Sequence, residues 1–109
     1  MNIKAAEELS GVSRQNIRFY EREGLLNPDR NPENDYREYQ QEHIETLKMI
    51  RVMRMLDMPL DQIKLVLEGS ISPAKAAKEQ RQKLKAQQEQ LSAAIRFCEE
   101  WSAFQTMEA

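Results

Sequence analysis

Apolar residues recur at helical spacing in several segments before residue 70, with glycine, proline or polar residues between the segments. In segments 3–9, 41–56 and 60–67, apolar residues recur about every third position, which is the period of one face of an α-helix. A further segment, 14–23, begins after the good N-cap Ser13 and ends before Gly24. The pattern therefore predicts four short helices, and the close succession of the first two predicts a helix-turn-helix.

The segment between the second and third helices, residues 25–39, has a different composition. Two prolines and three asparagines exclude a helix there, whereas Tyr36 and Tyr39 favour extended backbone. Asn34 and Asp35 are suited to a tight turn between two strands. This segment is therefore predicted to form a two-stranded β-hairpin, a wing beside the helices.

After Pro73 the sequence contains no further proline or glycine, and alanine, glutamine, glutamate and lysine dominate. Nothing in this stretch breaks a helix, so it is predicted to form one long helix. The boundary divides the chain into a head of short elements separated by glycine and proline, residues 1–69, and a helical extension, residues 70–109.

The long helix carries an apolar stripe at seven-residue intervals, made by Ala77, Leu84, Leu91 and Cys98. This is the repeat of a coiled coil, although the second seam of the repeat is polar. Because an isolated amphipathic helix is marginal in water, the stripe needs a partner, and the simplest one is a second copy of the chain. The residues predicted to form this dimer interface are Leu84, Leu91, Ile95, Cys98 and Trp101.

Composition narrows the class of protein. Lys and Arg number 16 against 18 Asp and Glu, and the net charge of −2 excludes a uniformly basic nucleic-acid coat but not a local basic face. A single cysteine excludes an internal disulfide and a multi-cysteine metal site within one chain. No apolar run reaches the roughly 20 residues of a membrane span, and the N-terminus lacks the apolar stretch of a signal peptide. We expect a soluble, cytoplasmic protein without a cofactor.

The predicted helix 14–23 carries the side chains best suited to reading DNA. Arg14, Arg18 and Arg22 follow one another at four-residue spacing, which places three guanidinium groups along one face. Gln15 and Asn16 lie in the first turn, which a recognition helix directs toward base edges, and Arg, Asn and Gln hydrogen-bond those edges. The alternative is a solvated face on which the arginines pair with nearby glutamates.

Two further groups are open to both a functional and a structural interpretation. A second basic row lies on the third helix at three-residue spacing: Lys48, Arg51 and Arg54. A solubilising face opposite the apolar side is its simpler interpretation. In the wing, Tyr36, Arg37 and Tyr39 are suited to phosphate and sugar contacts, while packing onto the head is the alternative, above all for Tyr36.

No arrangement of residues favours an enzyme. His43 is the only histidine, Cys98 lies on the distant long helix, and no third member of a catalytic triad accompanies them. The sequence also lacks a glycine-rich loop that could cradle phosphates. Cys98 itself is either a buried heptad residue or a redox- or metal-sensing thiol shared across a dimer. We therefore predict no catalytic residues and no metal ligands.

Taken together, the head resembles the N-terminal part of MerR-family transcription regulators. The order and gaps match from Ile3 to about Glu68. The matching residues are Gly11-Val12-Ser13, Asn16 to Glu21, Gly24-Leu25-Leu26, Pro28, Arg30, Tyr36-Arg37, Tyr39 and the Met58 to Ile63 start of the fourth helix. So many positions in order make this resemblance far more specific than a single short motif.

The resemblance implies a mainly α fold, with a winged helix-turn-helix head of four short helices and a β-hairpin, followed by one long dimerisation helix in an antiparallel coiled coil. It implies a homodimer that binds double-stranded, palindromic promoter DNA with an overlong spacer. Family members typically bend and untwist that spacer so that RNA polymerase can use the promoter. RNA polymerase is thus an indirect partner.

The DNA contacts that the residues and the resemblance together predict are Ser13, Arg14, Gln15, Asn16, Arg18, Phe19, Tyr20, Tyr36, Arg37, Tyr39 and Arg54. Arg18 and its neighbours match the surface that enters the groove. Tyr20, Tyr36 and Arg37 match positions that contact the DNA backbone. Arg54 matches a basic position near the end of the third helix that also approaches phosphate.

The sequence departs from the family pattern in its turns and at its C-terminal end. Asp35 and Asp57 stand where the family often has glycine. Metal-sensing relatives carry paired cysteines beyond the long helix, drug-sensing relatives carry a ligand domain, and this sequence has neither. It is either a minimal regulator with an unknown effector or the DNA-binding and dimerisation part of a longer protein. The rival from another class is a helical interaction adaptor whose tail docks on a different protein.

Overall fold

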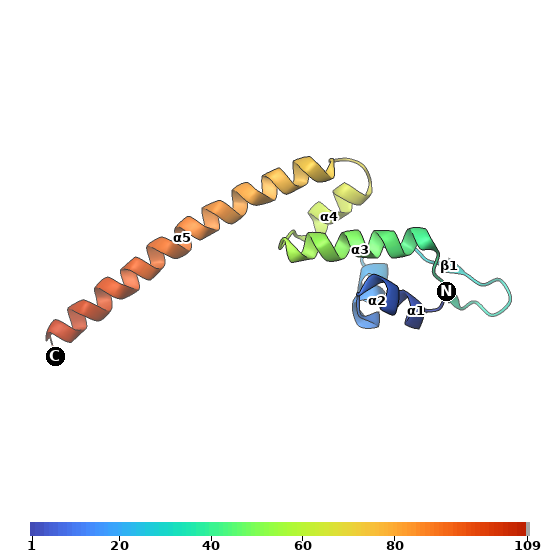
Figure 1. The fold of residues 1–109 in the computed structure, drawn as a ribbon, viewed down its shortest axis with the longest axis horizontal. Helices are drawn as coiled ribbons and strands as arrows, with labels where there is room; N and C mark the ends of the chain where they lie inside the picture. Colours follow the sequence, from blue (N-terminus) through green and yellow to red (C-terminus); the bar gives the residue numbers. More distant parts are fainter. Residues whose placement is uncertain (109) are drawn as a thin grey trace. The chain divides into compact units, whose positions relative to one another are not determined.

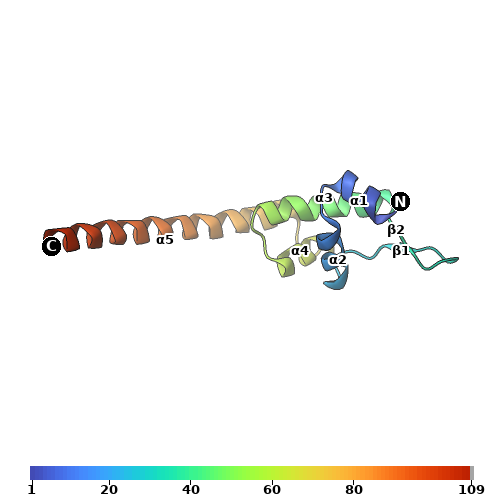
Figure 2. The same ribbon diagram turned by 90° about the horizontal axis from the view of Figure 1, so that it is seen from below.

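The computed structural model describes residues 1–108 and separates the chain into two units, each described here by itself. The first unit, Met1–Ser72, is the head. The second is the tail helix, α5, which spans Pro73–Glu108. Figure 1 and Figure 2 show the helices of the head gathered together, with the loop of a small hairpin extending away from them in both views.

Within residues 1–72 the structure contains four short helices and one two-stranded sheet, in the order α1, α2, β1, β2, α3, α4. The helices are α1 (Ile3–Ser10), α2 (Arg14–Arg22), α3 (Gln41–Met55) and α4 (Leu60–Leu67). Each begins within one residue of the position predicted from the sequence, and α2 and α3 end one residue earlier than expected. The predicted mainly α head with a hairpin is therefore confirmed.

Local capping explains the first two helices and the turn between them. The Oδ1 atom of Asn2 accepts a hydrogen bond from the Ala5 amide at 2.9 Å, and Ser13 Oγ accepts one from the Asn16 amide at 3.2 Å. Gly11 ends α1 in the left-handed conformation, with φ of 75°, which costs glycine little because it has no Cβ. These caps fix α2 close behind α1, as a helix-turn-helix requires.

The wing consists of β1 (Asp29–Arg30) and β2 (Arg37–Glu38), which pair antiparallel. Asp29 lies opposite Glu38 and Arg30 opposite Arg37. The loop between them spans residues 31–36, so the expected tight turn at Asn34 and Asp35 is wrong. The amide of Asp35 instead donates to the Asn31 carbonyl at 2.8 Å, which closes a wider turn.

Two aspartates adopt the left-handed backbone conformation that glycine often supplies. Asp35 has φ of 59° at the end of the wing loop, and Asp57 has φ of 60° just after α3. Asp tolerates this region better than most residues because its short polar side chain adapts to it, although the conformation still costs free energy. Both aspartates thus adopt the backbone conformation that a glycine at these positions would supply.

The head is held together by a core to which α3 contributes most. Ile44, Leu47 and Ile50, from one face of α3, are at most 1 % exposed. The other large side chains that are fully buried in the head are Ile17, Tyr39, Met58 and Ile63. Burying one large apolar side chain contributes on the order of 1.5–3 kcal/mol, so this cluster is the main source of stability in the head.

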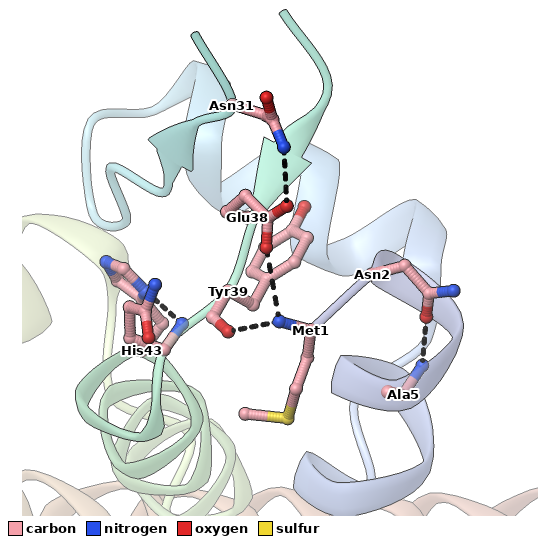
Figure 3. A network of polar contacts seen from close by, with 8 residues as sticks. Met1, Asn2, Ala5, Asn31, Glu38, Tyr39 and His43 are labelled. Carbon is pink, nitrogen blue, oxygen red and sulfur yellow. Dashed lines mark hydrogen bonds and ion pairs between the residues drawn. The ribbon is translucent and has the colours of Figure 1, made fainter. Parts of the chain in front are cut away.

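The wing joins this core at Tyr39, which follows β2. The Met1 nitrogen donates to the Tyr39 carbonyl at 2.9 Å (Figure 3). The Tyr39 amide donates in return to the Met1 carbonyl at 2.8 Å. The Tyr39 ring packs edge-on against His43, whose Nδ1 accepts a hydrogen bond from the Gln40 amide at 2.8 Å. The base of the wing is thereby tied both to the start of the chain and to the first turn of α3.

The tail helix α5 is continuous through Glu108, as the absence of proline and glycine predicted. It presents large apolar side chains that remain more than a third exposed in the single chain: Leu84, Leu91, Ile95, Phe97, Trp101 and Phe104. Among the described residues, no helix is long and apolar enough to cross a membrane.

Candidate nucleic-acid interface

The residues of α2 that pack into the core determine which face of this helix is exposed. Ile17 is fully buried and Tyr20 is 6 % exposed, so these two side chains fix the inner face. The outer face is exposed, and its polar side chains are Arg14, Gln15, Asn16, Arg18 and Arg22. The helix therefore presents the predicted row of arginines and amides to solvent.

The three arginines of this row have different surroundings. Within residues 1–108, the Arg18 side chain makes no hydrogen bond or ion pair, so its guanidinium donors are available to a ligand. Arg22 lies over the Phe19 ring, 6.0 Å from its centroid. Arg14 lies 3.7 Å from the Glu7 carboxylate, as the solvated interpretation of the row proposed.

Glu7 also occupies the start of α2. Its Oε2 atom accepts a hydrogen bond from the Arg14 amide at 2.7 Å. A carboxylate at this position interacts favourably with the positive end of the helix dipole. The head itself thus supplies an anion at the start of α2.

Arg18 opens onto two neighbouring clefts between α2 and the wing. The first, of about 330 Å³, is lined by residues that include Arg18, Arg22, Arg30 and Arg37. The second, of about 250 Å³, shares three of these arginines and adds Tyr36, which is 73 % exposed. The structure thus brings helix and wing cations to one basic face, and the alternative interpretation of Tyr36, packing onto the head, is wrong.

Arg30 belongs to this face but was not among the predicted contacts. Its Nη1 atom donates to the Asp35 carbonyl at 3.0 Å, and it lies opposite Arg37 in the hairpin. The signal was present in the sequence, because Arg30 is part of the family motif. Only the strand register shows that it lies beside Arg37.

A third cleft, of about 330 Å³, lies between the start of α2 and α3. Ser13, Asn16, Arg51 and Arg54 are among its lining residues. Arg51 lies so close to Gly11 that a Cβ on this glycine would be 3.1 Å from Nη1. The basic residues of α3 therefore have different surroundings. Arg51 and Arg54 line the cleft beside α2, whereas Lys48 lies 3.8 Å from Glu45 on α3 itself.

Tyr39 requires a correction. It was predicted to contact DNA, yet its side chain is completely buried and its hydroxyl donates to Glu21 Oε1 at 2.6 Å. Burial, together with this hydrogen bond and the negative charge of Glu21, raises the pKa of the Tyr39 hydroxyl well above its usual value. Tyr39 therefore anchors the wing and cannot touch a nucleic acid.

The same carboxylate holds a second wing residue. Glu21 Oε2 accepts a hydrogen bond from Arg37 Nε at 2.8 Å, and the Glu21 side chain is only 10 % exposed. One glutamate of α2 thus binds two residues from the end of the wing. Sequence reasoning named Glu21 only as part of the family motif and as a possible partner of the arginines on its own helix.

The predicted dimer residues lie on α5 and are free in the single chain. Leu84 is 37 % exposed, Leu91 64 %, Ile95 56 % and Trp101 68 %, and Cys98 is also exposed. Among the described residues, no group of three or more His, Cys, Asp or Glu side chains could hold a metal ion.

Comparison with protein families assigns both units of the chain. Residues 1–70 match the family model described as MerR HTH family regulatory protein, and residues 44–101 match the model described as MerR, DNA binding. A curated relative, heavy metal-dependent transcription regulator 2 of Rhizobium meliloti, is 42 % identical over 67 residues, which cover 62 % of this chain and 46 % of the relative. The chain thus spans about half the length of this relative.

Solved structures share the fold. The lead(II) complex of the transcription regulator PbrR691 from Ralstonia metallidurans is 28 % identical, with a TM-score of 0.75 over 88 % of this chain and 80 % of that one. HiNmlR, a MerR family regulator lacking the sensor domain and bound to promoter DNA, is 24 % identical, with a TM-score of 0.59 over 93 % of this chain and 76 % of that one. The second likeness concerns the fold alone.

Proposed function

The chain belongs to the MerR family of helix-turn-helix regulatory proteins, and from this premise we propose that it binds promoter DNA sequence-specifically as a homodimer. The observation that carries the proposal is the exposed face of α2. Arg18 stands there without a partner in residues 1–108, between clefts that also contain Arg30 and Arg37. Such a face offers side chains for base edges beside cations for phosphates.

In the proposed complex, α2 enters the major groove and the wing lies along the flanking backbone. Arg18 and the amide side chains of the first turn contact base edges. Arg37 and Tyr36 contact phosphate and sugar, and Arg54 contacts phosphate beside the start of α2. Bending and untwisting of an overlong promoter spacer is the mode of regulation that the family resemblance supports.

The charge pattern of α5 supports antiparallel pairing of the two tail helices. Residues 73–90 contain five Lys and Arg against two Glu, a net charge of +3, and residues 91–108 contain one Arg against three Glu, a net charge of −2. Antiparallel pairing sets the positive half of each helix beside the negative half of its partner. The same pairing covers the exposed apolar stripe, which costs free energy while it faces water.

Selection of DNA tests this proposal directly. The chain is incubated at near-physiological salt with a random or genomic pool of fragments, and the bound fragments are sequenced. We expect an inverted repeat within an overlong promoter spacer. If no sequence is enriched, the proposal fails for this chain and the adaptor alternative becomes the better account of the exposed α5 stripe.

Arg18→Ala identifies the contact once a sequence is selected. Loss of a base contact should weaken specific binding by about 1–3 kcal/mol and relax the preference for the selected sequence. Lys48→Ala removes the same charge from a residue that pairs with Glu45 on α3, and it should leave the sequence preference unchanged. Equal behaviour of the two variants would remove Arg18 from the recognition surface.

A further inference from the structure

The wing cannot fix its own direction relative to α2. Each of its strands has two residues, and its loop spans residues 31–36. An isolated two-stranded hairpin is at best marginally stable in water. The large side chain of its loop that could pack, Tyr36, directly precedes β2 and is 73 % exposed. Contacts outside the hairpin must therefore determine where the wing cations lie.

Glu21 supplies such contacts from the recognition helix itself. Its two carboxylate oxygens accept hydrogen bonds from Arg37 Nε at 2.8 Å and from the Tyr39 hydroxyl at 2.6 Å. Arg37 and Tyr39 are alternate residues of an extended segment, so their side chains point to the same side and reach one carboxylate. A carboxylate that is 10 % exposed is costly unless it is paired and hydrogen-bonded, and here it is both.

The bond to Arg37 leaves most of its donors free. The guanidinium has five N–H groups in a rigid fork, and Glu21 takes the one on Nε. Within residues 1–108 no other hydrogen bond of the Arg37 side chain occurs. Both terminal nitrogens can therefore bind a phosphate while Nε holds the group in place, and Arg37 lines both clefts that Arg18 opens onto.

We propose that Glu21 is a positioning residue for DNA binding, which locks Arg37 to α2 so that wing and recognition helix engage the duplex as one rigid unit. The inference rests on the proposed function, because it concerns how the same face binds DNA. The proposed effect of Glu21 on DNA affinity is opposite to the one expected of an acidic side chain. An acidic side chain beside a DNA-binding face normally weakens binding by repelling phosphates, whereas this one strengthens it by orienting a cation.

The sign is tested with two variants that remove the same charge from the same region. Glu21→Gln keeps the shape of the side chain but removes its negative charge. It also leaves one acceptor oxygen in place of the two that hold Arg37 and Tyr39. Glu23→Gln removes an exposed carboxylate two residues further on, whose side chain has no partner within residues 1–108. Binding is measured by fluorescence anisotropy on the duplex obtained by selection and on a random-sequence duplex of equal length.

We expect Glu21→Gln to weaken binding to the selected duplex about tenfold, the order expected when a charge-assisted hydrogen bond is lost. Glu23→Gln should leave binding unchanged or strengthen it. In an Arg37→Ala background Glu21→Gln should have no further weakening effect, because its target is gone. Equal strengthening by both glutamine variants would overturn the proposal.

The salt dependence separates positioning from simple destabilisation. If Arg37 loses its phosphate, the slope of log K against log [salt] falls by about 0.9 for each wing that loses this contact. A variant that is merely less folded loses the same fraction of active protein at every salt concentration, so its slope stays at the wild-type value. An unchanged slope would therefore overturn the inference.

Arg37→Lys decides the question should Glu21→Gln fail to fold. It keeps the charge on a partly exposed residue but cannot bind Glu21 and a phosphate through one fork. Its DNA affinity and its slope of log K against log [salt] should fall by about as much as those expected for Glu21→Gln. Wild-type binding by this variant would refute the positioning role. If the wild-type chain binds no duplex, the proposed function and the inference both fail. If the wild-type chain binds and the variants bind equally well, the inference alone fails.

Discussion

The head buries a core of large apolar residues, whereas α5 leaves many of its own exposed. In the head, α3 buries Ile44, Leu47 and Ile50 almost completely, so its apolar face is already satisfied within one chain. In α5, Leu91 and Trp101 remain 64 % and 68 % exposed. The head thus has the buried core expected of an independently folding domain, whereas α5 has a surface that is completed only by another molecule. The difference locates intramolecular stability in one unit and association in the other.

Leu47→Ala should have the largest effect on the stability of the head. Leu47 is fully buried, and truncation of a buried leucine removes transfer free energy and leaves a cavity. We expect the free energy of unfolding to fall by about 2–5 kcal/mol in urea titrations. Leu65→Ala, at a position of the head that is 42 % exposed, should cost much less. Similar losses for the two variants would show that the head lacks the single core described above.

Leu91→Ala makes the same chemical change in α5 and should act on a different equilibrium. If α5 pairs with a second copy, two leucines leave the interface per dimer, each worth about 1–2 kcal/mol, and the dimer dissociation constant should rise at least tenfold. Sedimentation equilibrium measures this change. Gln82→Ala, at an exposed and uncharged position on the outer side of the heptad repeat, should leave the dissociation constant close to wild type. Unchanged association of Leu91→Ala would remove this stripe from the dimer interface.

The sequence was sufficient for the helices because their signals are local. Asn2, Ser13 and Gly11 cap or end their helices through residues at most four positions away. The spacing of Ile44, Leu47 and Ile50 likewise predicted the face of α3 that is buried. The absence of helix breakers after Pro73 was enough for α5.

The candidate site was harder to predict, because its geometry depends on contacts between distant residues. Tyr39 was assigned to DNA by its place in the motif, but its hydroxyl binds Glu21, 18 positions away. Two-residue strands are too short for alternation to reveal which side chains face inward. The role of Glu7 at the start of α2 was invisible for the same reason, since it depends on how the turn folds back. Arg18 needs no such contact: it is exposed, as both interpretations of the arginine row require, and its contact with DNA stays a prediction.

The buried Tyr39 hydroxyl should make the stability of the head sensitive to alkaline pH. All three tyrosines lie before residue 40, and the pKa of Tyr39 is raised in the folded state by burial and by Glu21. A raised pKa stabilises the fold fully below the unfolded value of about 10, and this contribution is lost as pH rises through the folded pKa. The free energy of unfolding should therefore fall above about pH 10, by at most about 1.4 kcal/mol per pH unit.

Tyr39→Phe isolates this contribution, because Tyr20 and Tyr36 remain in both proteins. Urea unfolding is measured from about pH 8 to pH 11 for the wild type and the variant. The difference in stability between them should shrink as pH rises above about 10. A constant difference across this range would mean that the Tyr39 hydroxyl titrates normally and is not shielded by the head.

The smallest predicted effect concerns the wing, the part of the head that most resembles α5 in its lack of a core. Asp35 has φ of 59°, which is strained for a residue with a Cβ, and its amide donates to the Asn31 carbonyl at 2.8 Å. Asp35→Gly should stabilise this turn by about 0.5 kcal/mol, after the greater entropy of the unfolded glycine is subtracted. Amide hydrogen exchange at position 35, corrected for intrinsic rates, should slow about twofold. Asp35→Ala keeps the Cβ and should speed exchange instead, so that opposite shifts in the two variants would show that strain in the loop, and not the lost carboxylate, governs the order of the wing.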